Sequence, residues 1–522
     1  MIPSSYRLHG RLDVKCFEQS LEELIRRHES LRTTFPLHTD QPVQIIHPVR
    51  SYCLPVIDLQ KVREDEQTHV VQQLAEQEAQ HSCNLTRGPL MRTYLLRLKA
   101  QEHVLLLTLH HIITDGWSNG VLVRELTTLY HANISGQPSP LASLPIQYAD
   151  YALWQREWLQ GEVLETQLAY WRKQLAGITS LKLPTDRPRP STQSQRGATY
   201  SFALSANMSE VLVNLSFQEN VTLFMMLLAA FQALLYCYSQ QDDVVVGTDV
   251  ANRHRVEIEG LVGFFVNQLV LRANLSGNPT FRELLKQVRT VTLEAYAHQD
   301  LPFEKLVEAL RPKRSMQYAP LFQIKILFHN AFTETLRTQD EVLLPGVAVS
   351  QQSLSTGTTQ IDLLLRLSQT PRGLVGAFTY STDLFDAATI ERMADHFVKL
   401  LESISANPDA RLSTLEIIID EEKEQKSMKQ EERLKNAIAQ FKRVQPRPIS
   451  LQQDQLIQTE YLSPEEHLPL VIRPQRVELD LVEWVESNQS FIEAELCKHG
   501  ALLFRDFHIS SPVEFERFAL AL

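Results

Sequence analysis

The chain has 522 residues, of which 43% are hydrophobic and 22% charged, and its formal net charge is −11 at pH 7. This length exceeds the size at which a single hydrophobic core stops growing, so two or three folded units are expected. The acidic balance argues against a nucleic-acid-binding surface. No run of 18 apolar residues and no signal-peptide pattern occurs, which argues against membrane insertion and secretion.

The cysteines are scattered and odd in number, and they show no zinc-binding spacing. They are Cys16, Cys53, Cys83, Cys237 and Cys497. Such cysteines are typical of buried or free thiols in a reducing compartment. We therefore expect a cytoplasmic protein.

Helical and strand patterns alternate in the first part of the chain. Apolar residues at helical spacing between Phe17 and Ile25 predict one helix, and residues 70–80 predict another. Residues 90–98 alternate as a strand does. The run from Val104 to Leu109 is apolar except for Thr108, which predicts a strand covered on both faces.

The segment after this buried strand carries titratable side chains. It reads Leu109-His110-His111-Ile112-Ile113-Thr114-Asp115-Gly116-Trp117-Ser118. Adjacent residues of a strand point to opposite sides, so one imidazole can face a cleft while the other packs inward, and the residues alone favour neither. Apolar residues at helical spacing predict a helix that begins near Trp117 or Ser118. Its positive dipole end would lie beside two histidines that can act as general acid or base.

The second part of the chain begins after a proline-rich passage at 183–190. A strand is predicted near Tyr200–Leu204, an apolar helix at 223–238 and a buried strand at 244–247. Residues 421–446 are rich in charge and have few apolar anchors, which predicts a solvated helix or linker.

Five motifs, in this order, resemble the condensation domains of non-ribosomal peptide synthetases. They are Arg27-His28-Glu29-Ser30-Leu31-Arg32-Thr33-Thr34-Phe35, the His110–Gly116 segment, Tyr148–Arg156, Val262-Gly263-Phe264-Phe265-Val266-Asn267 with Arg272, and His298–Glu304. The resemblance covers roughly residues 1–420.

The resemblance implies an α/β (α+β) fold with two chloramphenicol acetyltransferase-like lobes in a V shape around a central tunnel. Residues 1–178 would form the first lobe, without its usual first elements, and residues 179–420 the second. A charged linker at 421–460 and an incomplete segment at 461–522 would follow.

The last segment resembles the opening of a taurine dioxygenase-like 2-oxoglutarate- and iron-dependent enzyme. The resemblance rests on Leu468–Ile472, Trp484 and His499–Phe507. A non-haem iron site needs a His-x-Asp/Glu pair and a distant histidine. The two local pairs, His38-Thr39-Asp40 and His298-Gln299-Asp300, lie in the condensation-like part, so we predict no metal site in this chain.

The resemblance also implies roles for individual residues. His111 would face the tunnel and either remove a proton from the attacking amine or orient it. Asp115 would hold the active loop through an ion pair, with Arg272 or Arg32 as its partner, because a lone buried carboxylate is costly. Gly116 would offer its backbone near the thioester carbonyl or permit the turn.

Three supporting residues complete the predicted site. His110 would be a packed, hydrogen-bonded neighbour of the working imidazole. Trp117 is more typical of a core residue than of a substrate contact. Asn267 would form a hydrogen bond across the lobe interface, or cap the end of a strand.

The implied reaction is amide formation between two carrier-bound substrates. An acyl or peptidyl thioester on the 4'-phosphopantetheine arm of an upstream carrier is attacked by the amine of an aminoacyl group on a downstream carrier. We expect these carrier domains as partners, within a larger multidomain synthetase, and no directly bound cofactor. Two alternatives stay open: a non-catalytic interface domain that docks a carrier for a neighbouring dioxygenase, and an inactive truncated fragment.

Overall fold

The computed structural model describes residues 2–312, 317–329, 342–352, 357–415, 456–463, 466–475, 479–509 and 512–522. The chain divides into two compact units, Met1–Glu424 and Gln425–Leu522. The predicted charged stretch at 421–446 lies outside the described residues.

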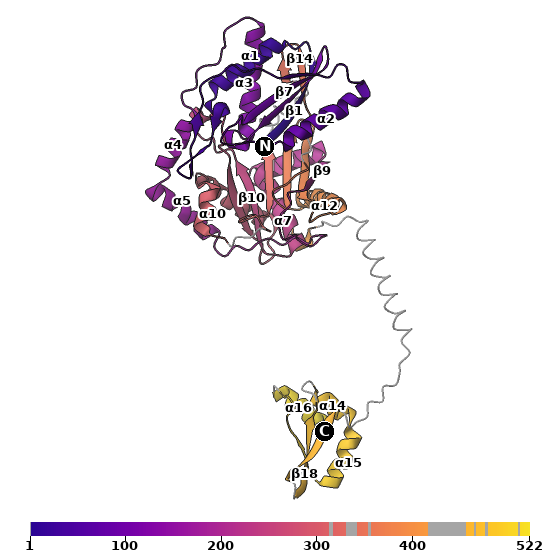
Figure 1. The fold of residues 1–522 in the computed structure, drawn as a ribbon. Coiled ribbons are helices and arrows are strands. Elements are labelled where there is room, and N and C mark those ends of the chain that lie inside the picture. The colour runs from indigo at the N-terminus through magenta and orange to yellow at the C-terminus, as the bar shows by residue number, and fades with distance from the viewer. Residues whose placement is uncertain are drawn as a thin grey trace. The chain divides into compact units, whose positions relative to one another are not determined.

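The first unit contains two six-stranded sheets (Figure 1). The first sheet is coloured mainly indigo, and the second runs from magenta to orange. The first sheet has the order β13 (Val342–Leu344), β14 (Val347–Gln352), β1 (Ile2–Gly10), β8 (Glu102–Leu109), β7 (Met91–Lys99) and β6 (Val56–Asp58). The second has the order β11 (Asn267–Asn274), β10 (Asp243–Val250), β12 (Ile324–His329), β15 (Leu363–Thr370), β16 (Gly373–Ser381) and β9 (Gly197–Ala203).

The first sheet is covered by helices on both faces, because the side chains of β8 alternate between two hydrophobic clusters. Leu105 packs with residues of α1 (Val14–Arg27) and α3 (Gly116–Ile134), whereas Leu106 packs with Val71 and Ala75 of α2 (Glu64–Gln80). The predicted strand that is buried on both faces is therefore confirmed. The helix predicted to begin at Trp117 or Ser118 begins at Gly116 instead.

Two strands of the first sheet come from late in the sequence. β14 pairs antiparallel with β1, and β13 pairs with β14, so the segment 342–352 lies beside the beginning of the chain. Figure 1 shows β14, coloured orange, among the indigo strands. The segment 342–352 therefore connects the two sheets, because the strands before and after it in the sequence belong to the second sheet. The lobe boundary at residue 178 stays a prediction.

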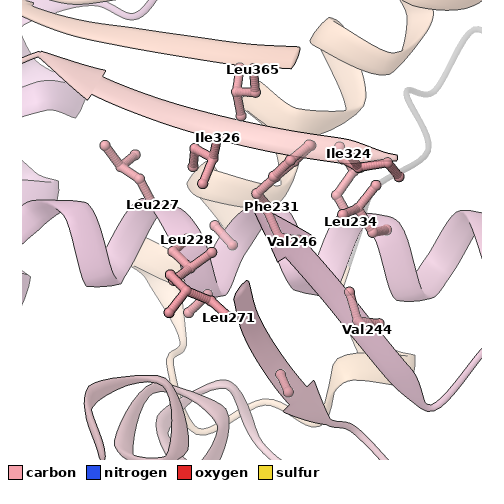
Figure 2. Close-up of a cluster of buried hydrophobic side chains, with 14 of the residues drawn as sticks. Leu227, Leu228, Phe231, Leu234, Val244, Val246, Leu271, Ile324, Ile326 and Leu365 are labelled. Atoms are coloured by element: carbon pink, nitrogen blue, oxygen red, sulfur yellow. The ribbon is translucent and has the colours of Figure 1, made fainter. Parts of the chain in front are cut away.

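The second sheet is built around a buried helix, α7 (Leu223–Ser239), which matches the predicted apolar helix. Figure 2 shows Phe231 and Leu234 of α7 facing strands β10 and β12. The other labelled members of this cluster are Leu227, Leu228, Val244, Val246, Leu271, Ile324, Ile326 and Leu365. Further helices on this side are α6 (Ala206–Gln218), α9 (Phe281–Ala297) and α12 (Ala387–Ala406).

Shorter elements connect these layers. They are η1 (Glu29–Arg32), β2 (Thr33–Thr34), β3 (Leu37–His38), β4 (Gln41–Pro42), β5 (Ile45–Ile46), η2 (His111–Ile113), α4 (Tyr148–Trp158), α5 (Gly161–Gln174), α8 (Val256–Glu259), α10 (Phe303–Leu310) and η3 (Leu412–Thr414). Within the described residues, no single helix is long and apolar enough to cross a membrane; α6 and α7 pass that test only as a pair bent by 104°.

The second unit contains a three-stranded sheet of β17 (Ile457–Ser463), β18 (Glu466–Pro474) and β19 (Leu502–Phe504). Its helices are α14 (Leu481–Ser487), α15 (Gln489–His499) and α16 (Pro512–Ala521). β18 pairs antiparallel with β17 and parallel with β19, and Ile472 and Val485 are fully buried in its core. Gly500, at φ +70°, ends α15 in the left-handed conformation that favours glycine.

Candidate active site

The two predicted histidines follow β8, a central strand of the first sheet. The backbone N–H of His110 donates to the Leu90 carbonyl at 2.8 Å, and its Nδ1 accepts the N–H of Ile112 at 3.1 Å. Burial lowers the pKa of His110. His110 is therefore a half-buried residue whose ring helps to shape the loop.

His111 differs from His110 in both exposure and bonding. Its side chain is exposed, and its Nδ1 lies 2.9 Å from the carbonyl oxygen of Thr114. A carbonyl only accepts hydrogen bonds, so Nδ1 carries the hydrogen in this contact, and the lone pair of a neutral ring lies on Nε2. The ring of Phe264 stands edge-to-face against the imidazole, with 5.1 Å between the centroids.

Asp115 is the N-cap of helix α3 and is almost fully buried. Its Oδ1 accepts the N–H of Ser118 at 2.8 Å, which is an N-cap bond, and its Oδ2 accepts the N–H of Phe265 at 3.0 Å. Phe265 lies in the segment that leads from β10 to β11 of the second sheet. The carboxylate therefore joins the two halves of the first unit, which are the half that contains the first sheet and the half that contains the second. The loop that carries His111 is thereby held from both sides.

The ion-pair partner of Asp115 is Arg253, not Arg272 or Arg32. The Arg253 Nη2 lies 3.3 Å from the carboxylate, and both side chains are 1% exposed. Arg272 instead pairs with Asp243 in its own sheet, and Arg32 donates to the His47 carbonyl and to Glu29. The predicted partners were wrong because each of these arginines lies beside a nearer acceptor.

Arg253 is held by several further contacts. Its Nη1 donates to the carbonyls of Ile258 and Leu261 at 2.6 and 2.7 Å, and its Nη2 donates to the Ser118 hydroxyl at 2.8 Å. The guanidinium carbon also lies 4.1 Å from the ring centroid of Phe265. These contacts offset much of the cost of burying the charge, although the Arg253 Nε is buried without a hydrogen-bond partner among the described residues.

A second set of contacts joins α3 to the segment 262–264. The Ser118 hydroxyl donates to the Gly263 carbonyl at 2.9 Å and accepts the Gly263 N–H at 3.1 Å. A Cβ atom on Gly263 would lie 2.2 Å from Cδ2 of Tyr148, so only glycine fits here. The Tyr148 hydroxyl donates to the Phe264 carbonyl at 2.8 Å.

Gly116 and Trp117 occupy the first turn of α3. Gly116 is exposed and lies outside the positive-φ region, and a Cβ atom there would have no neighbour within 4 Å. The expectation that glycine permits the turn is therefore wrong, whereas the open space beside its backbone fits the other predicted role. Trp117 is half-buried and donates from Nε1 to the Glu259 carbonyl at 2.9 Å.

Asn267 does not bridge the two halves. Its Nδ2 donates to the carbonyls of Gln299 and Leu301, and its Oδ1 accepts the N–H of Phe303 at 3.0 Å. All of these groups belong to the loop before α10 or to its first residue, in the same half as Asn267. The predicted contact across the interface was wrong, because this loop lies closer to the start of β11.

The contacts that sequence reasoning missed centre on Arg253 and Ser118. Both lie in or near elements that the sequence did indicate: Arg253 comes shortly after the buried strand β10, and Ser118 lies in the first turn of α3. A charged residue just past a buried strand was the available signal. Nothing in the residue pattern indicated that these two side chains meet.

No group of three His, Cys, Asp or Glu side chains that could hold a metal ion occurs among the described residues. The Nδ1 of His298 contacts the Glu294 carbonyl at 2.8 Å. Asp300 lies 3.5 Å from His254. His38 and Asp40 lie in and beside the short β3–β4 hairpin.

Comparison with protein families matches residues 1–427 to the condensation domain. The chain belongs to the condensation domain family. One of the linear gramicidin synthase proteins of Brevibacillus parabrevis is 50% identical to this condensation domain chain over 425 residues, which are 81% of the chain and 5% of the synthase protein. The chain therefore spans about a twentieth of the length of that relative.

Solved structures agree with this assignment. The X-domain from teicoplanin biosynthesis, which has also been solved in complex with OxyB, is 30% identical, with a TM-score of 0.73 over 80% of this chain and 93% of that one. The first condensation domain of the calcium-dependent antibiotic synthetase is 20% identical and shares the fold, with a TM-score of 0.64 over 80% and 93% of the two chains. The predicted mixed α/β fold of the chloramphenicol acetyltransferase type is confirmed.

Members of the condensation family form amide bonds, and the relatives of this chain are multidomain peptide synthetases. The exposed imidazole of His111 lies in the motif that the sequence singled out. The roles of the individual residues, the tunnel and the substrates remain predictions.

Proposed function

We propose that this condensation domain joins a carrier-bound acyl or peptidyl thioester to a carrier-bound aminoacyl group through an amide bond. The observation that carries the proposal is the hydrogen bonding and exposure of the His111 side chain. Its Nδ1 is bonded to the Thr114 carbonyl at 2.9 Å, while its ring is exposed, so Nε2 is available as a proton acceptor.

The chemistry balances without an added reagent. The amine nitrogen of the acceptor attacks the thioester carbonyl carbon, the C–N bond forms and the C–S bond breaks. His111 Nε2 accepts a proton from the attacking amine and returns it to the departing sulfur of the donor's phosphopantetheine arm. General base catalysis of this kind contributes about 10²- to 10⁴-fold, and positioning can contribute as much.

The surrounding residues position this step. The Asp115–Arg253 pair and the Ser118–Gly263 bonds fix the loop of His111 against the other half of the molecule. Gly116 is exposed and leaves open space at the amino end of α3, where the helix dipole favours the negative charge that develops on the thioester oxygen.

The partners that this reaction requires are an upstream and a downstream carrier domain, each with its substrate on a phosphopantetheine arm. The identity to linear gramicidin synthase supports membership of a larger synthetase. The five cysteines are all unpaired, which supports a reducing, cytoplasmic setting. Alkylation of these thiols in intact cells, read by mass spectrometry, tests that location.

The test of the proposed function is transfer between two loaded carriers, followed by intact-protein mass spectrometry. The full chain should move the donor onto the acceptor carrier, and His111→Ala should lower the rate by about 10²- to 10⁴-fold. His131→Ala is the matched control, since His131 is exposed on α3, the helix that follows the loop of His111. Full activity in His111→Ala would refute the proposed role of the imidazole.

A second candidate function is a non-catalytic docking domain. The observation that favours it is the likeness to the teicoplanin X-domain, which has been solved in complex with OxyB. In the same experiment, binding of a loaded carrier without any transfer would support docking. If the chain neither binds the carrier nor transfers the donor, that result would support an inactive fragment.

We also infer that residues 461–522 are the opening of a dioxygenase-like domain. The inference rests on the strand at Leu470–Ile472 and the left-handed turn at Gly500 before β19. An experimental structure of the chain tests it by superposition on the first elements of a taurine dioxygenase. The same order and direction of β17, β18 and β19 would support the inference, and a different order would refute it.

A further inference from the structure

The aromatic pair Phe264-Phe265 places two identical side chains in opposite environments. Phe265 is 3% exposed and packs against the rings of Tyr148 and Tyr151, with centroids 5.0 and 4.8 Å away. Phe264 is 37% exposed, although its neighbours Val262 and Phe265 are buried. Leaving a phenyl ring exposed forgoes part of the favourable free energy that full burial provides.

The backbone on both sides of Phe264 is held in place. Gly263 exchanges two hydrogen bonds with the Ser118 hydroxyl, the Phe264 carbonyl accepts the Tyr148 hydroxyl, and the Phe265 N–H donates to Asp115. The ring of Phe264 therefore cannot retreat by a shift of its own backbone without breaking these bonds.

The exposed ring faces the imidazole of the proposed reaction. The two centroids are 5.1 Å apart and the ring planes are at 87°. His111 is fixed in turn by its bond to the Thr114 carbonyl. Two rings from different halves of the molecule thus meet at fixed positions, and both are open to solvent.

The geometry limits where the side chain of an acceptor can go. An attacking nitrogen must lie about 3 Å from His111 Nε2, and the α-carbon of the aminoacyl group is one bond of about 1.5 Å farther. The α-carbon that carries the acceptor side chain is therefore about as far from the imidazole as the Phe264 ring, whose centroid is 5.1 Å from that of the imidazole. A bulky side chain on that side would overlap the ring.

We propose that Phe264 is a specificity-determining residue that limits the size of the acceptor's aminoacyl side chain. This inference rests on the proposed condensation function, since it assumes that the acceptor amine approaches His111. Discrimination by a single pocket contact of this kind is typically worth about 10- to 200-fold. Small acceptors should be preferred over bulky ones in the native chain.

The test is a competition between two acceptors in one reaction. The full chain receives one loaded donor carrier and equal amounts of alanyl- and tryptophanyl-loaded acceptor carriers, and mass spectrometry gives the ratio of the two products. Phe264→Ala should raise the tryptophanyl-to-alanyl ratio about tenfold or more. Phe264→Leu should give an intermediate ratio, and Phe264→Trp should lower it.

The control is Phe217→Ala, which removes a ring that is 77% exposed on α6 and should leave the ratio unchanged. An unchanged ratio in an active Phe264→Ala variant would overturn the inference and leave the proposed function standing. An equal loss of both products would also overturn it, because the ring would then only position His111. No product from the native chain would refute the proposed function itself, and the inference with it.

Discussion

The carboxylate of Asp115 and the guanidinium of Arg253 form an ion pair at 3.3 Å, with each side chain 1% exposed. Asp115 is the N-cap of α3, in the half that carries the histidines, and Arg253 follows β10 in the other half. A pair this deeply buried is worth little as a net gain, but removing one partner leaves an uncompensated charge. Its structural effect is to hold the loop of His111 against the segment that carries Phe264.

Loss of the Arg253 guanidinium should destabilise the protein strongly. Arg253→Met leaves the Asp115 carboxylate buried without its partner, and we expect the free energy of unfolding to fall by about 3–5 kcal/mol. Urea denaturation measures the change. Arg172→Met is the control, because its guanidinium is 50% exposed and lies 3.4 Å from Glu165, so its effect should stay below about 1 kcal/mol. Equal effects for both variants would contradict this account.

Loss of the Ser118 hydroxyl should also destabilise the protein. This oxygen is buried, and it contacts the Arg253 guanidinium and both backbone polar groups of Gly263. Ser118→Ala leaves the N–H and the carbonyl of Gly263 without this partner, at about 1–3 kcal/mol for each orphaned group. Thermal unfolding tests this against Thr128→Ala, whose hydroxyl donates to the Arg124 carbonyl of its own helix. A melting temperature equal to that of the control would be inconsistent with the bonding described.

The two glycines of the site should respond oppositely to alanine. In Gly263→Ala the new methyl group would lie 2.2 Å from a ring carbon of Tyr148, so overpacking should cost about 1–3 kcal/mol of stability. In Gly116→Ala the methyl group meets nothing within 4 Å, and the change should stay within about 0.5 kcal/mol. Urea denaturation of both variants tests the contrast. A larger loss for Gly116→Ala would show that the loop packs differently.

The stability should depend on pH through His110. Burial lowers the pKa of this residue, and Nδ1 can accept the Ile112 N–H only while it is unprotonated. Because the unfolded chain, with a histidine pKa near 6.5, binds the proton first, the contribution is complete above about pH 6.5 and is lost as pH falls through the unfolded and folded values. The free energy of unfolding should therefore rise with pH in this window.

The measurement is urea denaturation of the native chain and of His110→Ala at about pH 5.5 and 7.5. We expect His110→Ala to show a smaller difference between the two pH values than the native chain. His69→Ala, which replaces an exposed histidine on α2, serves as the control and should retain the native difference. An unaltered difference in His110→Ala would argue against the lowered pKa.

Much of the fold was predictable from local patterns in the sequence. The alternation of β7, the apolar run of β8 and the mostly apolar α7 each reflect the environment of one element, because burial imposes its period on the residues that face the core. The ordered motifs around His110 and His111 likewise indicated the condensation family before any contact was known. Each of these patterns is formed by residues that lie close to one another in the sequence.

Tertiary structure alone decided which distant residues meet. Asp115 pairs with Arg253 and not with Arg272 or Arg32, Asn267 bonds within its own half, and β14 joins the first sheet. Each outcome depends on where loops and strand ends lie in space. The periodicity of residue types does not indicate which distant side chains or strands will pair. The opposite exposures of Phe264 and Phe265 arise in the same way, since Ser118, Tyr148 and Asp115 set the direction of the backbone between them.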